Sequence, residues 1–273
     1  MTADRDTAAV PAVAVPLTDA ADAARYGGKA AQLAAAVRAG LPVPEGVALD
    51  AATVERIADG ELDGPVLAGG PFAVRSSAID EDAADASFAG QHRTCLGVPD
   101  AAAVAGAVRE VWESGRTPSA MAYRDRMGLP ATVSVAVVVQ QLVAADVAGV
   151  LFTRNPVTGA DERVVEAAWG LGEAVVQGLV TPDLYRLDTA GAVVERNPGY
   201  KDVAVRLDVD GGTAETPTAE HLVEALCLDD GQLVALHRLA ERCARLFHGP
   251  RDIEWAFAGG RLWLLQCRPV TTL

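Results

Sequence analysis

The chain has 273 residues, of which 50% are hydrophobic and 22% are charged, and its formal net charge is −14 at pH 7. This composition is typical of a globular protein with a buried core, large enough for one domain or for two lobes. The negative charge argues against nucleic acid and anionic membranes as partners, because both are bound through clustered lysine and arginine. Any phosphate group must therefore be bound by a local group of cations.

The cysteine spacing and the N-terminus limit the cellular setting. Cys95, Cys227, Cys243 and Cys267 are far apart and lack the C-x-x-C spacing of a zinc site. Residues 1–16 lack the basic start and continuous apolar stretch of a secretory signal, and no segment approaches the ~20 apolar residues of a membrane span. We therefore expect a cytoplasmic protein that is not embedded in a membrane.

The first half of the chain predicts an N-terminal lobe of strands and helices over residues 1–145. Tyr26-Gly27-Gly28-Lys29 is expected to open a helix that ends at Gly40. The polar stretch 76–91 lacks the apolar periodicity of a helix or strand, which predicts a long functional loop or a lid. The other expected elements are strands at 13–17, 72–75 and 133–143 and helices at 101–112 and 119–127.

A second lobe is expected over residues 146–273. Its apolar segments predict strands at 149–153, 163–167 and 185–188 and a helix at 232–247. The sequence contains no repeat period that would indicate a solenoid. Both halves together predict an α/β (α+β) protein with two lobes of mixed sheets and a hinge in the middle of the chain.

The last two expected strands form a hairpin, Asp252–Phe257 and Arg261–Pro269. A three-residue loop from Ala258 to Gly260 would place Glu254 opposite Leu264 and diagonal to Gln266. Glu254, Gln266 and Arg268 would then share one face, where a carboxylate and an amide oxygen suit Mg²⁺ and a guanidinium suits phosphate. An ordinary amphipathic hairpin with a solvated polar face is the alternative interpretation.

Two further clusters suit phosphate binding. Gly27-Gly28-Lys29 precedes a helix whose N-terminus attracts anions, although the sequence lacks the pattern of a Walker A loop. Arg75-Ser76-Ser77, the acidic residues that follow and the stretch Ser87 to Thr94 offer hydroxyl, guanidinium and backbone donors around Gly90. A glycine turn and a solvated polar loop remain the alternatives.

Two apolar or glycine-rich segments complete the set of candidates. The strand Val137 to Val143 ends in a connection whose free backbone groups could bind an adenine ring, with Leu142 and Val143 packed against it. The segment from Glu166 to Glu173 has glycines that allow a close approach of backbone to a ligand. A core strand that leaves its sheet and a tight connector are the alternatives.

The order of these segments resembles the nucleotide-binding domain of the PEP synthase, pyruvate phosphate dikinase and rifampin phosphotransferase family. The motifs are Gly27-Gly28-Lys29, Arg75-Ser76-Ser77 through Gly90-Gln91, Val139-Gln140, Trp169-Gly170-Leu171-Gly172-Glu173, Asp252-Ile253-Glu254-Trp255 and Gln266-Cys267-Arg268-Pro269. The resemblance covers the chain from about Tyr26 to its end. It implies an ATP-grasp fold, in which two lobes clamp Mg-ATP.

The resemblance also implies a role for individual residues. Lys29 and Arg75 match the family's phosphate-contacting residues, and Gly90 and Thr94 fall in the loop that covers the phosphates. Gln140 matches the glutamine beside the adenine, with Gln141 as the alternative if the register shifts by one residue. Glu254 and Gln266 match the ligands of Mg²⁺, and Arg268 matches the arginine that contacts the transferred phosphoryl group. Cys95 and Ala83 depart from the family pattern.

A phosphoryl acceptor is the part of the family's chemistry that the sequence does not provide. Full-length members pass a phosphoryl group to a histidine on a swivelling domain, and none of His92, His221, His237 and His248 lies in that motif. We therefore expect a phosphotransferase subunit that binds ATP and Mg²⁺ and phosphorylates a separate phosphohistidine-domain protein. A self-sufficient kinase or ligase and a non-catalytic nucleotide sensor are the alternative functions.

Overall fold

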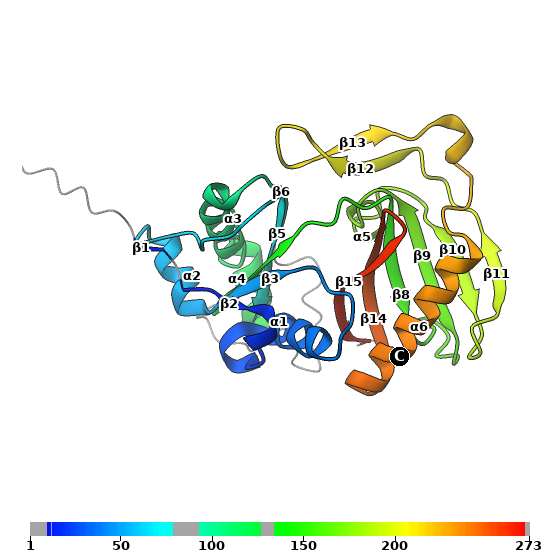
Figure 1. The fold of residues 1–273 in the computed structure, drawn as a ribbon, viewed down its shortest axis with the longest axis horizontal. Helices are drawn as coiled ribbons and strands as arrows, with labels where there is room; N and C mark the ends of the chain where they lie inside the picture. The colour runs from blue at the N-terminus through cyan, green and yellow to red at the C-terminus, as the bar shows by residue number, and fades with distance from the viewer. Residues whose placement is uncertain (1–9, 12, 79–92, 127–133, 271–273) are drawn as a thin grey trace, which may run out of the picture.

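The computed structural model describes residues 10–11, 13–78, 93–126 and 134–270. Two lobes lie side by side, each built around its own antiparallel sheet (Figure 1). In the first half of the chain, β2, β3, β5, β6 and β7 form a five-stranded sheet with the order β2-β3-β7-β5-β6. From Val147 onward, β8 to β11, β14 and β15 form a six-stranded sheet with the order β11-β10-β9-β8-β14-β15, and β1 with β4 and β12 with β13 form separate two-stranded sheets. The expected α/β class with two lobes is confirmed, but the two large sheets are antiparallel rather than mixed.

The N-terminal sheet has helices on both faces because its central strand, β7, is apolar on both sides. Val135, Val137 and Val139 pack with α2 and α3 in one core, whereas Val138 packs against α1 in another. The elements of this lobe are β1 (Val10–Pro11), β2 (Val15–Pro16), α1 (Ala23–Arg38), β3 (Gly46–Leu49), α2 (Ala51–Ala58), β4 (Leu62–Asp63), β5 (Phe72–Ala78), β6 (Thr94–Val98), α3 (Ala101–Ser114), α4 (Pro118–Arg126) and β7 (Val135–Gln141).

The C-terminal sheet buries its larger core under α6. This helix starts with a capping box between Asp229 and Gln232 and packs its leucines on Trp255 and other buried sheet residues. The elements of this lobe are β8 (Val147–Phe152), β9 (Arg163–Trp169), α5 (Glu173–Val176), β10 (Asp183–Leu187), β11 (Val193–Asn197), β12 (Val203–Leu207), β13 (Thr213–Pro217), α6 (Asp230–Phe247), β14 (Arg251–Ala258) and β15 (Arg261–Pro269). Short 3₁₀ turns occur at Leu17–Asp19 in the N-terminal lobe and at Glu220–Leu222 in the C-terminal lobe.

The expectation that the polar stretch begins as a loop at Ser76 is wrong for its first three residues. Strand β5 continues through Ser76 and Ser77 to Ala78, paired with β7. The two serines are buried, because β7 provides a complete ladder partner that their own polarity does not indicate. The rest of the expected loop, residues 79–91, lies outside the described residues.

The terminal hairpin also differs from its expected register. Its loop has two residues, Gly259 and Gly260, both with positive φ, because Ala258 pairs with Arg261. The pairing then shifts by one residue between Glu254 and Trp255, as a β-bulge at Leu265. The bulge places Glu254 directly opposite Gln266, whereas the expected diagonal arrangement is wrong.

No helix in the described parts of the chain is long and apolar enough to cross a membrane.

Candidate functional site

A cavity of about 580 Å³ lies between the two lobes. Its volume is typical of sites for small molecules and cofactors. Both sheets contribute to its wall, and the terminal hairpin forms one side. The lining includes the described candidates Lys29, Arg75, Thr94, Gln140, Glu254, Gln266 and Arg268. The remaining candidate, Gly90, lies outside the described residues.

Helix α1 is kinked at Gly27, and the start of its second part is fixed against β5 by two local features. Gly27 has a φ of 77°, and a Cβ at this position would lie 2.0 Å from the carbonyl oxygen of Ser77, so only glycine fits. The backbone N–H of Ala30 donates a hydrogen bond of 3.0 Å to the Ser77 hydroxyl. Ser77 therefore satisfies a backbone donor at the start of this helical segment. It also holds Lys29, the residue before Ala30, beside the cavity.

Arg75 connects the N-terminal sheet to the terminal hairpin. Its Nη1 donates to Glu254 Oε2 at 3.3 Å and to the carbonyl oxygen of Leu265 at 3.4 Å. The Arg75 side chain is only 11% exposed, so its charge is held in a partly dehydrated setting at the interface of the lobes. Its Nε is buried and has no hydrogen-bond partner among the described residues.

The cavity face of the hairpin carries alternating polar side chains. Glu254 lies opposite Gln266, and Asp252 lies opposite Arg268 in the next pair of the same face. Arg268 donates from Nε to Asp252 Oδ2 at 2.8 Å, and this pair fixes the direction of the guanidinium. Sequence reasoning missed Asp252, although its position two residues before Glu254 is the signal that both carboxylates face the same side.

Asp252 is an unusual carboxylate because it is only 8% exposed. Burial raises its pKa, an effect that the Arg268 guanidinium partly offsets and the Glu254 charge reinforces. Its Oδ1 is buried without a hydrogen-bond partner among the described residues. Burial and the Asp252 charge also raise the pKa of Glu166, which lies on the adjoining part of this sheet. A cation at this face would therefore stabilise carboxylates that are poorly solvated.

This donor set fits a hard divalent cation. Glu254 provides a carboxylate and Gln266 provides an amide oxygen directly across the hairpin. Asp252, whose Oδ1 has no hydrogen-bond partner among the described residues, is on the same face of the strand. The described part of the chain has no group of three or more His, Cys, Asp or Glu residues that could bind a metal by itself. Such a site suits Mg²⁺, which commonly binds through one or two carboxylates together with phosphate oxygens and water.

Strand β7 brings Gln140 to the cavity, and the alternation of side chains separates it from Gln141. Gln140 is 3% exposed, and its Nε2 donates to the carbonyl oxygen of Pro44 at 3.5 Å. Gln141 donates instead to the carbonyl oxygen of Ala68 at 3.1 Å. Both residues line the cavity, with Leu142 beside them, but only Gln140 is buried at its wall.

The glycine-containing segment that follows β9 forms a wall of the cavity on the side of the C-terminal lobe. Leu171, Gly172 and Glu173 line the cavity, whereas Gly170 lies close to the carbonyl oxygen of Val205, as a tight connector would. Asp183, in contrast, is fully buried away from the cavity lining and forms an ion pair of 2.5 Å with Lys201. Asp183 therefore has a structural role in the C-terminal lobe.

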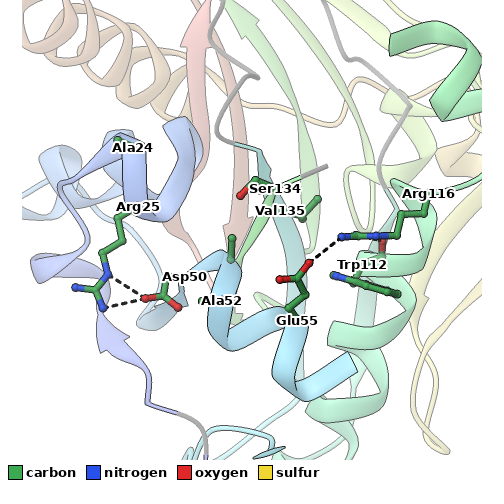
Figure 2. Close-up of a pocket in the computed structure, with 10 residues that line it drawn as sticks. Ala24, Arg25, Asp50, Ala52, Glu55, Trp112, Arg116, Ser134 and Val135 are labelled. Atoms are coloured by element: carbon green, nitrogen blue, oxygen red, sulfur yellow. Dashed lines mark hydrogen bonds and ion pairs between the residues drawn. The ribbon is translucent and has the colours of Figure 1, made fainter. Parts of the chain in front are cut away.

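A second pocket, of about 390 Å³, lies on the N-terminal lobe beside α2 and α3. Figure 2 shows that its charged groups are already paired, Arg25 with Asp50 and Arg116 with Glu55. The Arg116 guanidinium also stacks on the ring of Trp112, 3.7 Å from the ring centroid. These contacts satisfy one another, so the interlobe cavity is the better candidate for the functional site.

Most of the chain matches a known protein family. Residues 58–273 match the family described as "Pyruvate phosphate dikinase, AMP/ATP-binding domain". A probable phosphoenolpyruvate synthase of Methanothermobacter thermautotrophicus is 41% identical over 74% of this chain and 30% of its own length. A rifampicin phosphotransferase of Streptomyces sviceus is 42% identical over 74% of this chain and 23% of its own length.

The prodigiosin synthesizing transferase PigC of Serratia marcescens aligns over 91% of this chain and 32% of its own length, with 36% identity. The chain thus spans less than a third of the length of these three relatives. Among solved structures, a D-alanine–D-alanine ligase from Helicobacter pylori aligns over 90% of this chain and 54% of that chain, with 12% identity and a TM-score of 0.45. The assignment rests on the family match: this chain belongs to the AMP/ATP-binding domain family of pyruvate phosphate dikinase.

Proposed function

We propose that the chain binds Mg-ATP between its two lobes and drives phosphoryl transfer of the dikinase type. The observation that carries this proposal is the meeting of three cations with a carboxylate and an amide around one cavity. Lys29, Arg75 and Arg268 supply the positive charge, and Glu254 and Gln266 supply the oxygen ligands. In this proposal residues 1–145 and 146–273 are the two lobes of one ATP-grasp domain.

The proposed role of the cations is to neutralise the phosphates. Phosphoryl transfer depends mainly on positioning and on stabilising negative charge, which cations already held in place can do without reorganisation. Arg75 and Arg268 are fixed by carboxylates in the structure. Mg²⁺, when bound through Glu254 and Gln266, would supply charge neutralisation at the phosphate oxygens. The net charge of −14 is compatible with this, since salt screens distant charges beyond about 10 Å.

The other part of the nucleotide would lie beside Gln140 and Leu171. Both side chains line the cavity, together with Leu142 and Val143. An apolar wall with a few polar groups is the usual lining of a site for a flat heterocycle. Gln140 and the neighbouring backbone would hydrogen-bond the adenine edge, and the leucines would contact its faces.

The phosphoryl acceptor in this proposal is a histidine of a separate swivelling-domain protein. None of the described histidines, His221, His237 and His248, lines the cavity, and His92 lies outside the described residues. The relatives are larger than the segment that matches this chain, which is compatible with an acceptor domain outside that segment. One phosphoryl group of ATP would pass to the histidine and the other to water, so the products would be AMP, phosphate and a phosphohistidine on the partner.

Product analysis tests this proposal. The chain is incubated with Mg-ATP, alone and with a histidine-domain protein of the same family, and nucleotides are separated by anion-exchange chromatography. We expect AMP only in the presence of the partner. Conversion of ATP to AMP by the chain alone contradicts the need for a partner, and turnover to ADP with a small-molecule acceptor selects a self-sufficient kinase or ligase. Binding that is indifferent to Mg²⁺ and to Glu254→Ala selects a nucleotide sensor.

A further inference from the structure

The β12–β13 hairpin reaches the N-terminal lobe at a place separate from the contacts that β15 and α6 make with the end of α1. Figure 1 shows it extending over the top of the molecule toward β6. At its tip, the backbone N–H of Gly212 donates to the carbonyl oxygen of Gly97 at 2.7 Å. The hairpin therefore forms a direct backbone contact between the lobes, separate from the Arg75–Glu254 ion pair.

The contact at the tip depends on a close approach of two glycines. Gly97 lies where the pairing of β6 with β5 is irregular, and it has a φ of 71°. A Cβ at this position would lie 2.2 Å from the carbonyl oxygen of Gly212. Strand β6 begins at Thr94, which lines the cavity, so the tip fixes a strand that carries a candidate nucleotide contact.

The middle of the hairpin supports the cavity wall to which Leu171 belongs. The backbone N–H of Leu171 donates to the carbonyl oxygen of Val205 at 2.8 Å. Gly170 approaches the same carbonyl so closely that a Cβ there would lie 2.3 Å from its oxygen. Leu171 lines the cavity, and Val205 packs with it in a small apolar core. Strand β12 is thus a direct support of this wall.

The base of the hairpin is anchored by the buried ion pair. Lys201 lies two residues before β12 and is fully buried, with Nζ 2.5 Å from Asp183 Oδ1. Asp183 Oδ2 accepts from the backbone N–H of Cys227, on the segment that follows the hairpin. The Asp183 carboxylate therefore binds both the residue that precedes the hairpin and the segment that leads from the hairpin into α6. Because breaking a buried charge pair is costly, this base is a rigid support.

We propose that the β12–β13 hairpin is a strap that sets the spacing of the two lobes and positions their nucleotide-contacting segments. It is rigid at its base, supports Leu171 at its middle and holds β6 at its tip. Gly97 and Gly212 are positioning residues in this arrangement, since they act on the ligand through other groups. The inference rests on the proposed binding of ATP between the lobes.

The strap links nucleotide affinity to the tip contact. A ligand that touches both walls binds more tightly when their spacing is already correct, because less of its binding free energy is spent on ordering the lobes. Linkage is reciprocal, so bound nucleotide must in turn stabilise the Gly212–Gly97 hydrogen bond. Loss of the contact should weaken Mg-ATP binding about tenfold, within the range typical of coupled sites.

Two variants break the contact in different ways. Gly97→Ala places a methyl group against Gly212, and replacing residues 208–212 by Asn-Gly shortens the tip while keeping the pairing of Leu207 with Thr213. Gly60→Ala is the matched control, because Gly60 has a φ of 76° and nothing within 4 Å of its added Cβ. Gly97→Ala and Gly60→Ala both place alanine at a positive φ, but only Gly97→Ala disrupts the contact between Gly97 and Gly212.

Calorimetry with Mg-ATP, thermal unfolding and amide exchange of Gly212 test the strap. We expect a protected Gly212 amide without nucleotide and stronger protection with it. The dissociation constant should rise about tenfold in both tip variants, while their unfolding midpoints fall no further than that of Gly60→Ala. An unprotected Gly212 amide, or wild-type affinity in both tip variants, overturns the strap. Absence of Mg-ATP binding by the wild-type chain overturns the proposed function instead.

Discussion

Arg75 and Glu254 form an ion pair across the cavity, with Nη1 of the arginine 3.3 Å from Oε2 of the glutamate. The two residues are 179 positions apart and belong to different lobes. In the proposed function one is a phosphate ligand and the other a metal ligand. Each therefore holds the other in place until nucleotide and metal arrive, and the arginine retains further donors with which to bind phosphate.

Arg75→Gln should weaken binding of Mg-ATP roughly tenfold to a hundredfold, because a charge-assisted hydrogen bond contributes about 1.5–3 kcal/mol. Isothermal titration calorimetry measures the change. Arg56→Gln is the control, since Arg56 pairs with Glu61 on the surface with both side chains more than half exposed. Such a pair contributes about 0–1 kcal/mol to stability. Equal affinities of the Arg75 variant and the wild-type chain would remove Arg75 from the site.

Glu254 and Gln266 allow a swap experiment, because the bulge places them directly opposite each other. Glu254→Gln removes the carboxylate and should abolish most of the Mg²⁺ dependence of ATP binding. The double variant Glu254→Gln with Gln266→Glu restores one carboxylate and one amide and should regain part of that dependence.

The measurement for the swap is the ratio of ATP dissociation constants with and without Mg²⁺. Glu55→Gln is the control, as Glu55 is a carboxylate of the second pocket. A Glu254→Gln variant with the full wild-type dependence on Mg²⁺ contradicts the proposed metal site. A double variant without any recovery would mean that the pair is not interchangeable, so that Asp252 or Arg75 fixes the orientation of the carboxylate.

The terminal hairpin shows how far the sequence predicts the site. The two strands follow from the sequence pattern, and alternation alone places Gln266 and Arg268 on one face, but the loop and the register decide whether Glu254 shares that face. The loop length cannot be predicted from the sequence, since a Gly-Gly turn allows two residues with positive φ as well as a three-residue loop. The expected three-residue loop and the observed two-residue loop with a bulge both place Gln266 on the face of Glu254. A two-residue loop without a bulge would place Gln266 on the opposite face. The bulge at Leu265 has no sequence signal of its own.

Other differences come from interactions between distant segments. The helix α6 and strand β7 were predictable because their apolar patterns are long. The sequence predicts a loop at Ser77, but its hydroxyl accepts a hydrogen bond from Ala30, 47 residues earlier, at the start of a helical segment. The β12–β13 hairpin was missed because its short strands are only partly buried and alternate weakly. The pairing of Lys201 with Asp183 depends on the completed fold and cannot be read from their spacing.

Gln140 and Gln141 are adjacent, so a pair of variants distinguishes their roles. Gln140→Leu should weaken ATP binding roughly threefold to tenfold, the loss of about one hydrogen bond of 0.5–1.5 kcal/mol. Gln141→Leu should leave the affinity within twofold, because its amide serves the carbonyl of Ala68. Calorimetry with ATP and with adenosine gives both values. The opposite ranking would place Gln141 beside the adenine.

Cys95 gives a pH-dependent readout next to Thr94. Burial and the nearby Glu110 carboxylate raise the pKa of its thiol to about 11. A raised pKa means less thiolate at pH 8, on the order of a hundredfold less than for an ordinary cysteine with a pKa of about 8.5. Iodoacetamide should therefore alkylate Cys95 slowly at pH 8 and faster as the pH approaches 11, as measured by peptide mass spectrometry.

Glu110→Gln tests the cause of that shift. Removing the charge, whose Oε2 is 3.8 Å from Cys95 Sγ, should lower the thiol pKa and accelerate alkylation at pH 8. Glu113→Gln changes a carboxylate on the same helix, α3, and should leave the rate unchanged. Because burial is the larger cause, the Glu110 variant should still react more slowly than free N-acetylcysteine. A Glu110 variant with the wild-type rate would assign the shift to burial alone.

Lys29 can be probed chemically because the chain contains only two lysines, Lys29 and Lys201. Lys201 is fully buried in its ion pair, whereas Lys29 is partly exposed at the cavity. Acetic anhydride at low dose should acetylate Lys29 and the terminal amine in the folded chain and reach Lys201 only after unfolding in urea. Saturating Mg-ATP should protect Lys29 at least tenfold if its ammonium contacts phosphate, since a charge-assisted contact contributes about 1.5–3 kcal/mol. Adenosine, which lacks phosphates, should not protect it, and the terminal amine is the internal control. Acetylation of Lys29 at an equal rate with and without bound nucleotide would exclude it as a phosphate ligand.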